Sequence, residues 1–157
     1  MMKKLVLTGA GGRLGSYLRE PLSKMCEELV STDIVDDIGK LYAGETYARA
    51  DVAVYDQIAP LLEGADMVVH FGAIVDEKPF EELLGPNFVG SYNVWEAAYQ
   101  HGLKRVVYAS SIHAVGMHKK SDFIGIDAAH KPDTFYGLAK CFSEDLASMY
   151  WDKRGLE

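Results

Sequence analysis

The chain has 157 residues, 48% of them hydrophobic and 25% charged, which is typical of one globular domain with a sizeable core. Its formal net charge is −7, and so acidic a chain offers no basic stripe for nucleic acid. No apolar run approaches the roughly 18 residues of a membrane helix, and the first predicted strand leaves no room for a signal peptide.

Apolar runs alternate with helix-like segments along the whole chain, a pattern typical of a parallel sheet with crossover helices. We predict strands at about residues 3–8, 28–33, 46–50, 66–71 and 104–110. We predict helices at about 13–26, 54–62, 79–101 and 134–154, bent or broken at Pro21 and Gly90. The sequence therefore predicts an α/β, doubly wound Rossmann fold with strand order 3-2-1-4-5.

The first strand runs into a glycine-rich turn that opens the first helix. Gly9, Gly12 and Gly15 give the spacing G-x-x-G-x-x-G. Glycines let the backbone turn tightly and approach a pyrophosphate, and the helix N-terminus offers unpaired N–H groups. The motif predicts a dinucleotide site, but a glycine-rich turn without a ligand can have the same spacing.

Asp33 ends the second strand, where an acidic residue accepts hydrogen bonds from adenosine ribose hydroxyls. Its charge also repels a 2′-phosphate, which favours NAD over NADP. Arg13 argues weakly the other way, unless it contacts the pyrophosphate. Taken alone, an aspartate here is more often a turn or N-cap residue.

Two elements near the end of the chain carry groups suited to proton transfer. Tyr136 and Lys140 lie four residues apart on one face of the last predicted helix. A tyrosine with an ordinary pKa of about 10 needs a cationic neighbour to exchange protons near neutrality. Ser110 and Ser111 follow the fifth strand, where a hydroxyl either orients a substrate oxygen or turns the strand into a loop.

The long irregular stretch 112–133 follows the carboxyl end of a strand, where ligands bind in open α/β sheets. A doubly wound dinucleotide fold needs six strands, and the pattern supplies five before Glu157. We therefore expect residues 1–157 to be the NAD-binding Rossmann domain and N-terminal part of a longer protein, lacking the expected C-terminal strands.

In this order, the motifs resemble an extended short-chain dehydrogenase of the NAD-dependent epimerase/dehydratase family. The segments T-G-A-G-G-R-L-G, S-S-I-H-A-V-G and Y-G-L-A-K carry the resemblance. It implies NAD as cofactor and a catalytic triad of Ser111, Tyr136 and Lys140, with Ser111 five positions before Gly116. The implied cofactor-binding residues are Tyr136 and Lys140 together with Gly9, Gly12, Arg13, Leu14, Gly15, Asp33, Asp51, Val52, Phe71, Gly72, Ala73 and Asn87.

Within that family the chain is similar to uronate dehydrogenases, which oxidise the C1 hydroxyl of a cyclic hexuronic acid to an aldarolactone. The likeness implies a substrate site at Val75, Ser111, Ile112 and His113. Val75 and Ile112 stand where the family has a serine and an asparagine that face the sugar. Each lost polar partner leaves a sugar hydroxyl unpaired, at about 1–3 kcal/mol.

We therefore expect an NAD-dependent dehydrogenase acting on a sugar or sugar acid. Tyr136 takes the hydroxyl proton, Ser111 fixes the reacting oxygen, and Lys140 lowers the tyrosine pKa and holds the nicotinamide ribose. One alternative is a nucleotide-sugar epimerase or dehydratase, which shares these residues. Another is a non-catalytic NAD-sensing or scaffold protein. The presence of Ser111, Tyr136 and Lys140 together argues against it, because such a protein has no chemical need for all three residues.

No metal site is expected, because His118 and His130 lack carboxylate or cysteine partners at metal-ligand spacing. Cys26 and Cys141 also match no such spacing, which favours a reduced, cytoplasmic setting. We expect His70 to be a packed core histidine.

The resemblance further implies a homodimer built from the helices 79–101 and 134–154. In the second helix one apolar stripe can cover the sheet, and the remaining apolar residues need a partner unless they serve the domain's own core. The stripe comprises Leu138, Phe142, Leu146 and Tyr150, and the residues off it are Ala139, Met149 and Trp151.

Overall fold

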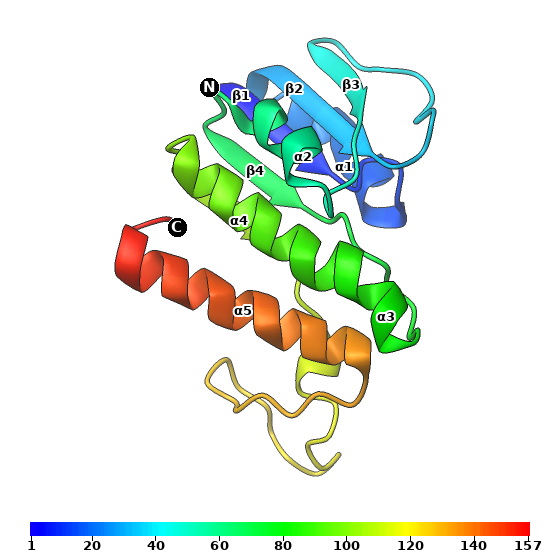
Figure 1. Ribbon diagram of the computed structural model, residues 1–157, viewed down its shortest axis with the longest axis vertical. Coiled ribbons are helices and arrows are strands. Elements are labelled where there is room, and N and C mark those ends of the chain that lie inside the picture. Colours follow the sequence, from blue (N-terminus) through cyan, green and yellow to red (C-terminus); the bar gives the residue numbers. More distant parts are fainter.

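The computed structural model describes residues 1–157 and contains one five-stranded parallel sheet (Figure 1). Its strands are β1 (Met2–Thr8), β2 (Cys26–Asp33), β3 (Glu45–Arg49), β4 (Met67–His70) and β5 (Arg105–Tyr108). The order β3-β2-β1-β4-β5 confirms the prediction, and every neighbouring pair is parallel.

The helices are α1 (Arg13–Ser23), α2 (Tyr55–Leu62), α3 (Phe80–Leu83), α4 (Gly90–Gln100) and α5 (Phe135–Arg154). A π-helical segment, η1 (Leu84–Val89), separates α3 from α4. The predicted helix 79–101 is therefore interrupted before Gly90, which begins α4. Pro86 lies inside η1 and has no N–H for an α-helical hydrogen bond, which accounts for the interruption. Pro21 lies inside α1 without breaking it.

Both faces of the sheet are covered, because its central strands are apolar on both sides. Val6, Val30 and Val68 face a cluster that includes residues of α2, α4 and α5. Leu5, Leu7 and their neighbours face the other way, toward α1. Figure 1 shows α2, α4 and α5 on one side of the sheet. These layers leave the carboxyl ends of the strands along one edge.

Between β5 and α5 the chain contains one short 3-10 helix, η2 (Ile112–Ala114). After α5, Gly155 adopts a left-handed conformation with φ 69°, and the chain turns back toward β5. Val106 N donates to Glu157 O at 2.7 Å, and Glu157 N donates to Lys104 O at 3.2 Å. None of the helices combines the length and apolar character needed to cross a membrane.

Candidate active site

The turn after β1 is built around contacts that only glycine permits. Gly9 has φ +70°, and a Cβ there would lie 2.7 Å from Gly72 N. A Cβ on Gly15 would lie 2.1 Å from Gly9 O, so α1 packs directly on the turn. Gly12 caps α1 without a side-chain hydrogen bond, and no acidic residue lies in the first turn. The helix N-terminus is therefore open to an anion such as a pyrophosphate.

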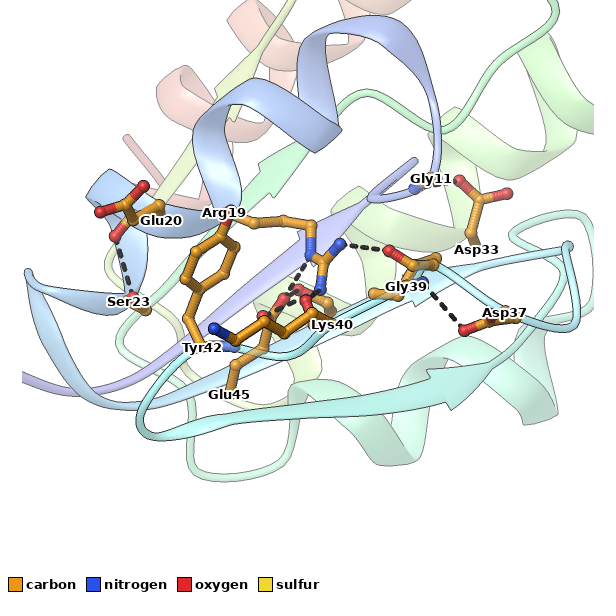
Figure 2. A network of polar contacts seen from close by, with 12 residues as sticks. Gly11, Arg19, Glu20, Ser23, Asp33, Asp37, Gly39, Lys40, Tyr42 and Glu45 are labelled. Atoms are coloured by element: carbon orange, nitrogen blue, oxygen red, sulfur yellow. Dashed lines mark hydrogen bonds and ion pairs between the residues drawn. The ribbon is translucent and has the colours of Figure 1, made fainter.

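Asp33 lies directly beside this turn (Figure 2). Its Oδ2 accepts Gly11 N at 2.9 Å, and its Oδ1 accepts Ile34 N at 2.7 Å. The Asp33 carboxylate thus binds backbone N–H groups of the turn, which is the structural alternative considered from the sequence. It also stands at the end of β2 next to the glycine turn, which is the place of a ribose ligand.

A buried ion pair under the segment 34–44 was not predicted from the sequence. Arg19 of α1 donates from Nε to Glu45 Oε1 at 2.7 Å and from Nη2 to Oε2 at 3.1 Å. Its Nη2 also donates to Lys40 O at 2.8 Å (Figure 2). Burial opposes ionisation of Glu45, yet hydrogen bonds from Arg19, Ser31 and the Tyr42 N–H hold its pKa below the usual value.

The segment after β4 is fixed to the glycine turn and to η1. Thr8 Oγ1 accepts Phe71 N at 3.2 Å and Gly72 N at 3.1 Å. Asn87 accepts Ile74 N at 2.9 Å and donates to Ile74 O at 2.8 Å, so both side-chain groups hold one residue. Asn87 lies in the π-helical segment, a geometry frequent at functional sites.

Asp51 and Val52, two of the expected cofactor-binding residues, differ in exposure. Asp51 is half-buried, and its Oδ1 accepts Ala53 N at 2.9 Å. Val52 is buried in the core, and a Cβ on Gly72 would touch its Cγ1 at 3.2 Å. Val52 therefore supports Gly72 from below, and its side chain is not open to a ligand.

Ser111, Tyr136 and Lys140 meet at the carboxyl end of β5. Ser111 Oγ accepts His113 N at 3.2 Å, and its hydroxyl lies close enough to the Tyr136 phenol to lower the pKa of the phenol. Ser110 instead bonds the carboxylate of Glu144, so the structure brings Ser111 rather than Ser110 to the tyrosine.

Lys140 is buried beneath the tyrosine. Its Nζ donates to Ala109 O at 2.8 Å and lies 4.5 Å from the Tyr108 ring centroid and 5.3 Å from that of Tyr136. Burial lowers the pKa of Lys140 to about 8.

The pKa of Tyr136 differs from the expectation. Burial raises the pKa above its ordinary value, and the Ser111 hydroxyl is the group that lowers it. Lys140 is not among the groups that lower it, because burial disfavours the ammonium and lowers the pKa of Lys140 itself to about 8, below that of the phenol. A further positive charge near the phenol is needed to bring its pKa toward neutrality.

Of the predicted substrate residues, Ser111 and His113 lie next to Tyr136. His113 Nδ1 lies 2.8 Å from Asp133 Oδ1, and its ring centroid lies 5.9 Å from that of Tyr136. This hydrogen bond lowers the pKa of the Asp133 carboxyl. Sequence reasoning missed Asp133 as a partner of His113, because the two residues lie twenty positions apart in an irregular stretch. Ile112 and Val75 are 81% and 67% exposed.

The remaining histidines have structural roles. His118 Nε2 lies 2.8 Å from Ala129 O. His130 has a carboxylate partner that its position in the sequence did not indicate, since the fold places its Nε2 2.9 Å from Glu144 Oε2. No group of three or more His, Cys, Asp and Glu side chains is arranged to hold a metal ion.

The glycine turn and Asp33 lie at the carboxyl ends of β1 and β2, and the Ser111–Tyr136–Lys140 cluster lies at that of β5, which is the arrangement of a Rossmann-type nucleotide site. Residues 5–157 match the model of the NAD dependent epimerase/dehydratase family, and the chain belongs to that family. It is 42% identical over 154 residues to uronate dehydrogenase from Pseudomonas putida, covering 98% of this chain. The chain spans 58% of the length of that relative.

Solved structures of similar proteins agree with the fold. Glucuronic acid dehydrogenase from Chromohalobacter salexigens superimposes with a TM-score of 0.95 at 38% identity, over 100% of this chain and 59% of that one. A mutant of uronate dehydrogenase from Agrobacterium tumefaciens complexed with NAD superimposes with a TM-score of 0.94 at 40% identity, over 99% of this chain and 58% of that one.

Proposed function

We propose that this chain is the NAD-binding domain of an NAD-dependent dehydrogenase that oxidises a sugar acid, with a hexuronate converted at C1 to the aldarolactone. The observation that carries the proposal is the meeting of Ser111, Tyr136 and Lys140 at the same carboxyl edge of the sheet that carries the glycine turn. The similarity to uronate dehydrogenases supports the substrate class.

In the proposed reaction the C1–H bond and the hydroxyl O–H bond of the substrate both break. NAD, when bound, supplies the hydride acceptor and a positive charge near the phenol. Ser111 holds the reacting oxygen, and Tyr136 in its ionised form takes the hydroxyl proton. Lys140 holds the nicotinamide ribose. The glycine turn and Asp33 bind the pyrophosphate and the adenosine ribose.

NADH formation with glucuronate, galacturonate, neutral sugars and nucleotide sugars tests the proposal. A hexuronate that yields NADH supports it. Interconversion of a nucleotide sugar without net NADH indicates an epimerase, and NAD binding without turnover of any compound indicates a sensing protein. If only a different sugar is oxidised, the apolar Val75 and Ile112 mark a changed specificity, and Ile112→Asn is the first reversal to make.

We also propose that the protein is a homodimer formed through α4 and α5. The support is a set of apolar side chains that the domain's own core leaves outside. In α5 the core takes Ala139, Leu146 and Tyr150, whereas Leu138, Phe142, Met149 and Trp151 are exposed. The predicted stripe is thus divided between the core and the surface. Light scattering that gives a monomer at micromolar concentration refutes the dimer.

We propose a reducing, cytoplasmic setting for the protein. The support is that Cys26 and Cys141 are buried and free.

A further inference from the structure

The Glu77 carboxylate accepts two N–H groups at the start of α5. Its Oε1 accepts Phe135 N and its Oε2 accepts Tyr136 N, each at 3.0 Å. The N-cap residue Thr134 accepts Gly137 N at 2.9 Å. Thr134 is a local cap, but Glu77 comes from the segment before α3, which Figure 1 shows close to the start of α5. The first turn of α5 is therefore fixed from outside the helix.

The segment that carries Glu77 is anchored at its other end to the cofactor side of the site. Asn87 holds both backbone groups of Ile74, and Thr8 holds the N–H groups of Phe71 and Gly72. Only Val75 and Asp76 separate Ile74 from Glu77. So short a connection, at about 3.5 Å per residue, does not let the two anchors move independently.

The elements that follow Glu77 in the chain, α3 and η1, also pack against α5. The ring of Phe80, at the start of α3, lies 5.8 Å from that of Phe135, and Phe88 of η1 lies 5.5 Å from Phe142. These contacts bring the backbone of Phe135 and Tyr136 to the Glu77 carboxylate. The negative charge also lies at the positive end of the α5 dipole, which favours the contact.

We propose that Glu77 is a positioning residue for Tyr136. By binding the backbone N–H of Tyr136, it fixes the phenol relative to Ser111 on the same scaffold that holds residues 71–74 at the glycine turn. This inference rests on the proposed dehydrogenase function. A displacement of about 1 Å at a reacting group can lower turnover roughly 100-fold, so a contact remote from the chemistry can control it.

The competing explanation is that Glu77 only caps α5. Thr134→Ala is the matched control, because it removes an acceptor from the same helix turn without touching the segment 71–77. If Glu77 acts as a positioning residue, Glu77→Ala lowers kcat about tenfold or more and changes KM for NAD less than about twofold. Thr134→Ala, with a comparable fall in Tm, changes kcat less than about twofold.

Glu77→Gln gives a second comparison, because it retains one acceptor oxygen and is expected to recover part of the lost kcat. Equal losses of kcat in Glu77→Ala and Thr134→Ala overturn the proposal. A loss confined to KM for NAD overturns it as well.

A readout without turnover separates this proposal from the proposed function. In protein with isotope-labelled tyrosine, the signal of Tyr136 is assigned with Tyr136→Phe and its phenol is titrated. We expect Glu77→Ala to shift the midpoint and to speed amide exchange at Tyr136, whereas Thr134→Ala leaves both near wild type. If no sugar acid is oxidised, the proposed function fails, but this titration still shows whether Glu77 positions Tyr136. An unmoved midpoint in Glu77→Ala overturns the positioning role.

Discussion

The Thr8 hydroxyl lies 2.7 Å from His70 Nδ1, across the neighbouring carboxyl ends of β1 and β4. Thr8 Oγ1 already accepts the N–H groups of Phe71 and Gly72, so its own hydrogen is the one shared with the ring. His70 Nδ1 therefore accepts, and the neutral ring carries its proton on Nε2. Burial lowers the pKa of His70 to about 3, with a smaller effect from Lys140.

This arrangement predicts loss of stability in mild acid. The unfolded chain protonates His70 at its ordinary pKa of about 6.5, whereas the folded protein does not until about 3. Stability from the neutral ring is full above about pH 6.5 and falls below it by about 1.4 kcal/mol per pH unit. Denaturant unfolding between pH 5 and 7 measures the slope. His70→Asn is expected to flatten it, and His101→Asn, at an exposed position, is the control.

Tyr136→Phe is expected to abolish proton transfer and to leave the ring in place. Turnover should fall by about 100-fold or more, because the variant removes the hydroxyl that takes the substrate proton in the proposed reaction. NAD binding, measured by fluorescence titration, should stay near wild type. Tyr92→Phe, at an exposed position of α4, provides the control. Near-normal turnover in Tyr136→Phe would show that the triad is assigned wrongly.

Asp33→Asn is expected to narrow the preference for NAD over NADP by roughly tenfold, or about 1.4 kcal/mol. The amide keeps one acceptor oxygen, for Gly11 N, so the variant removes the negative charge and the acceptor for Ile34 N but retains the contact with the glycine turn. Asp33→Ala removes both and should also weaken NAD binding. Titration of each variant with both cofactors gives the ratio. The proposed role of Asp33 fails if wild-type protein binds the two cofactors equally.

Arg19→Met is expected to destabilise the fold by about 3–5 kcal/mol, because it leaves the buried Glu45 carboxylate without its charged partner. Adding Glu45→Gln should recover much of the loss. Lys24→Met, in the exposed pair with Glu20, should change the unfolding free energy little. Urea unfolding of the four proteins completes the comparison, and similar losses from the buried and exposed pairs would contradict it.

The Arg19–Glu45 pair also predicts an effect of stronger acid. The folded-state pKa of Glu45 is lowered, so its contribution is present above the ordinary carboxyl pKa of about 4.5 and is lost as pH falls through the lower value. Unfolding of Glu45→Gln below pH 4.5 should therefore vary less with pH than unfolding of the wild type. Parallel curves for the two proteins would exclude a role for this carboxylate.

The sequence alone determined the sheet and the glycine turn of this protein. Strands of a parallel sheet are apolar on both faces, so each appears as a continuous local run such as Leu5-Val6-Leu7. The spacing of Gly9, Gly12 and Gly15 is also local, because the turn and the first helix follow each other directly. Tyr136 and Lys140 could be paired for the same reason, since one helix fixes their separation.

Only the tertiary structure decided which distant groups meet. The Glu77–Tyr136, Arg19–Glu45 and Asn87–Ile74 contacts join residues whose neighbours in sequence give no sign of their partners. The split of the α5 stripe, with Leu146 buried and Leu138 exposed, likewise depends on where α4 packs. Hydrophobic burial is non-directional and selects which face of a helix packs inward, but side-chain partners and pKa values are fixed only once the elements have packed.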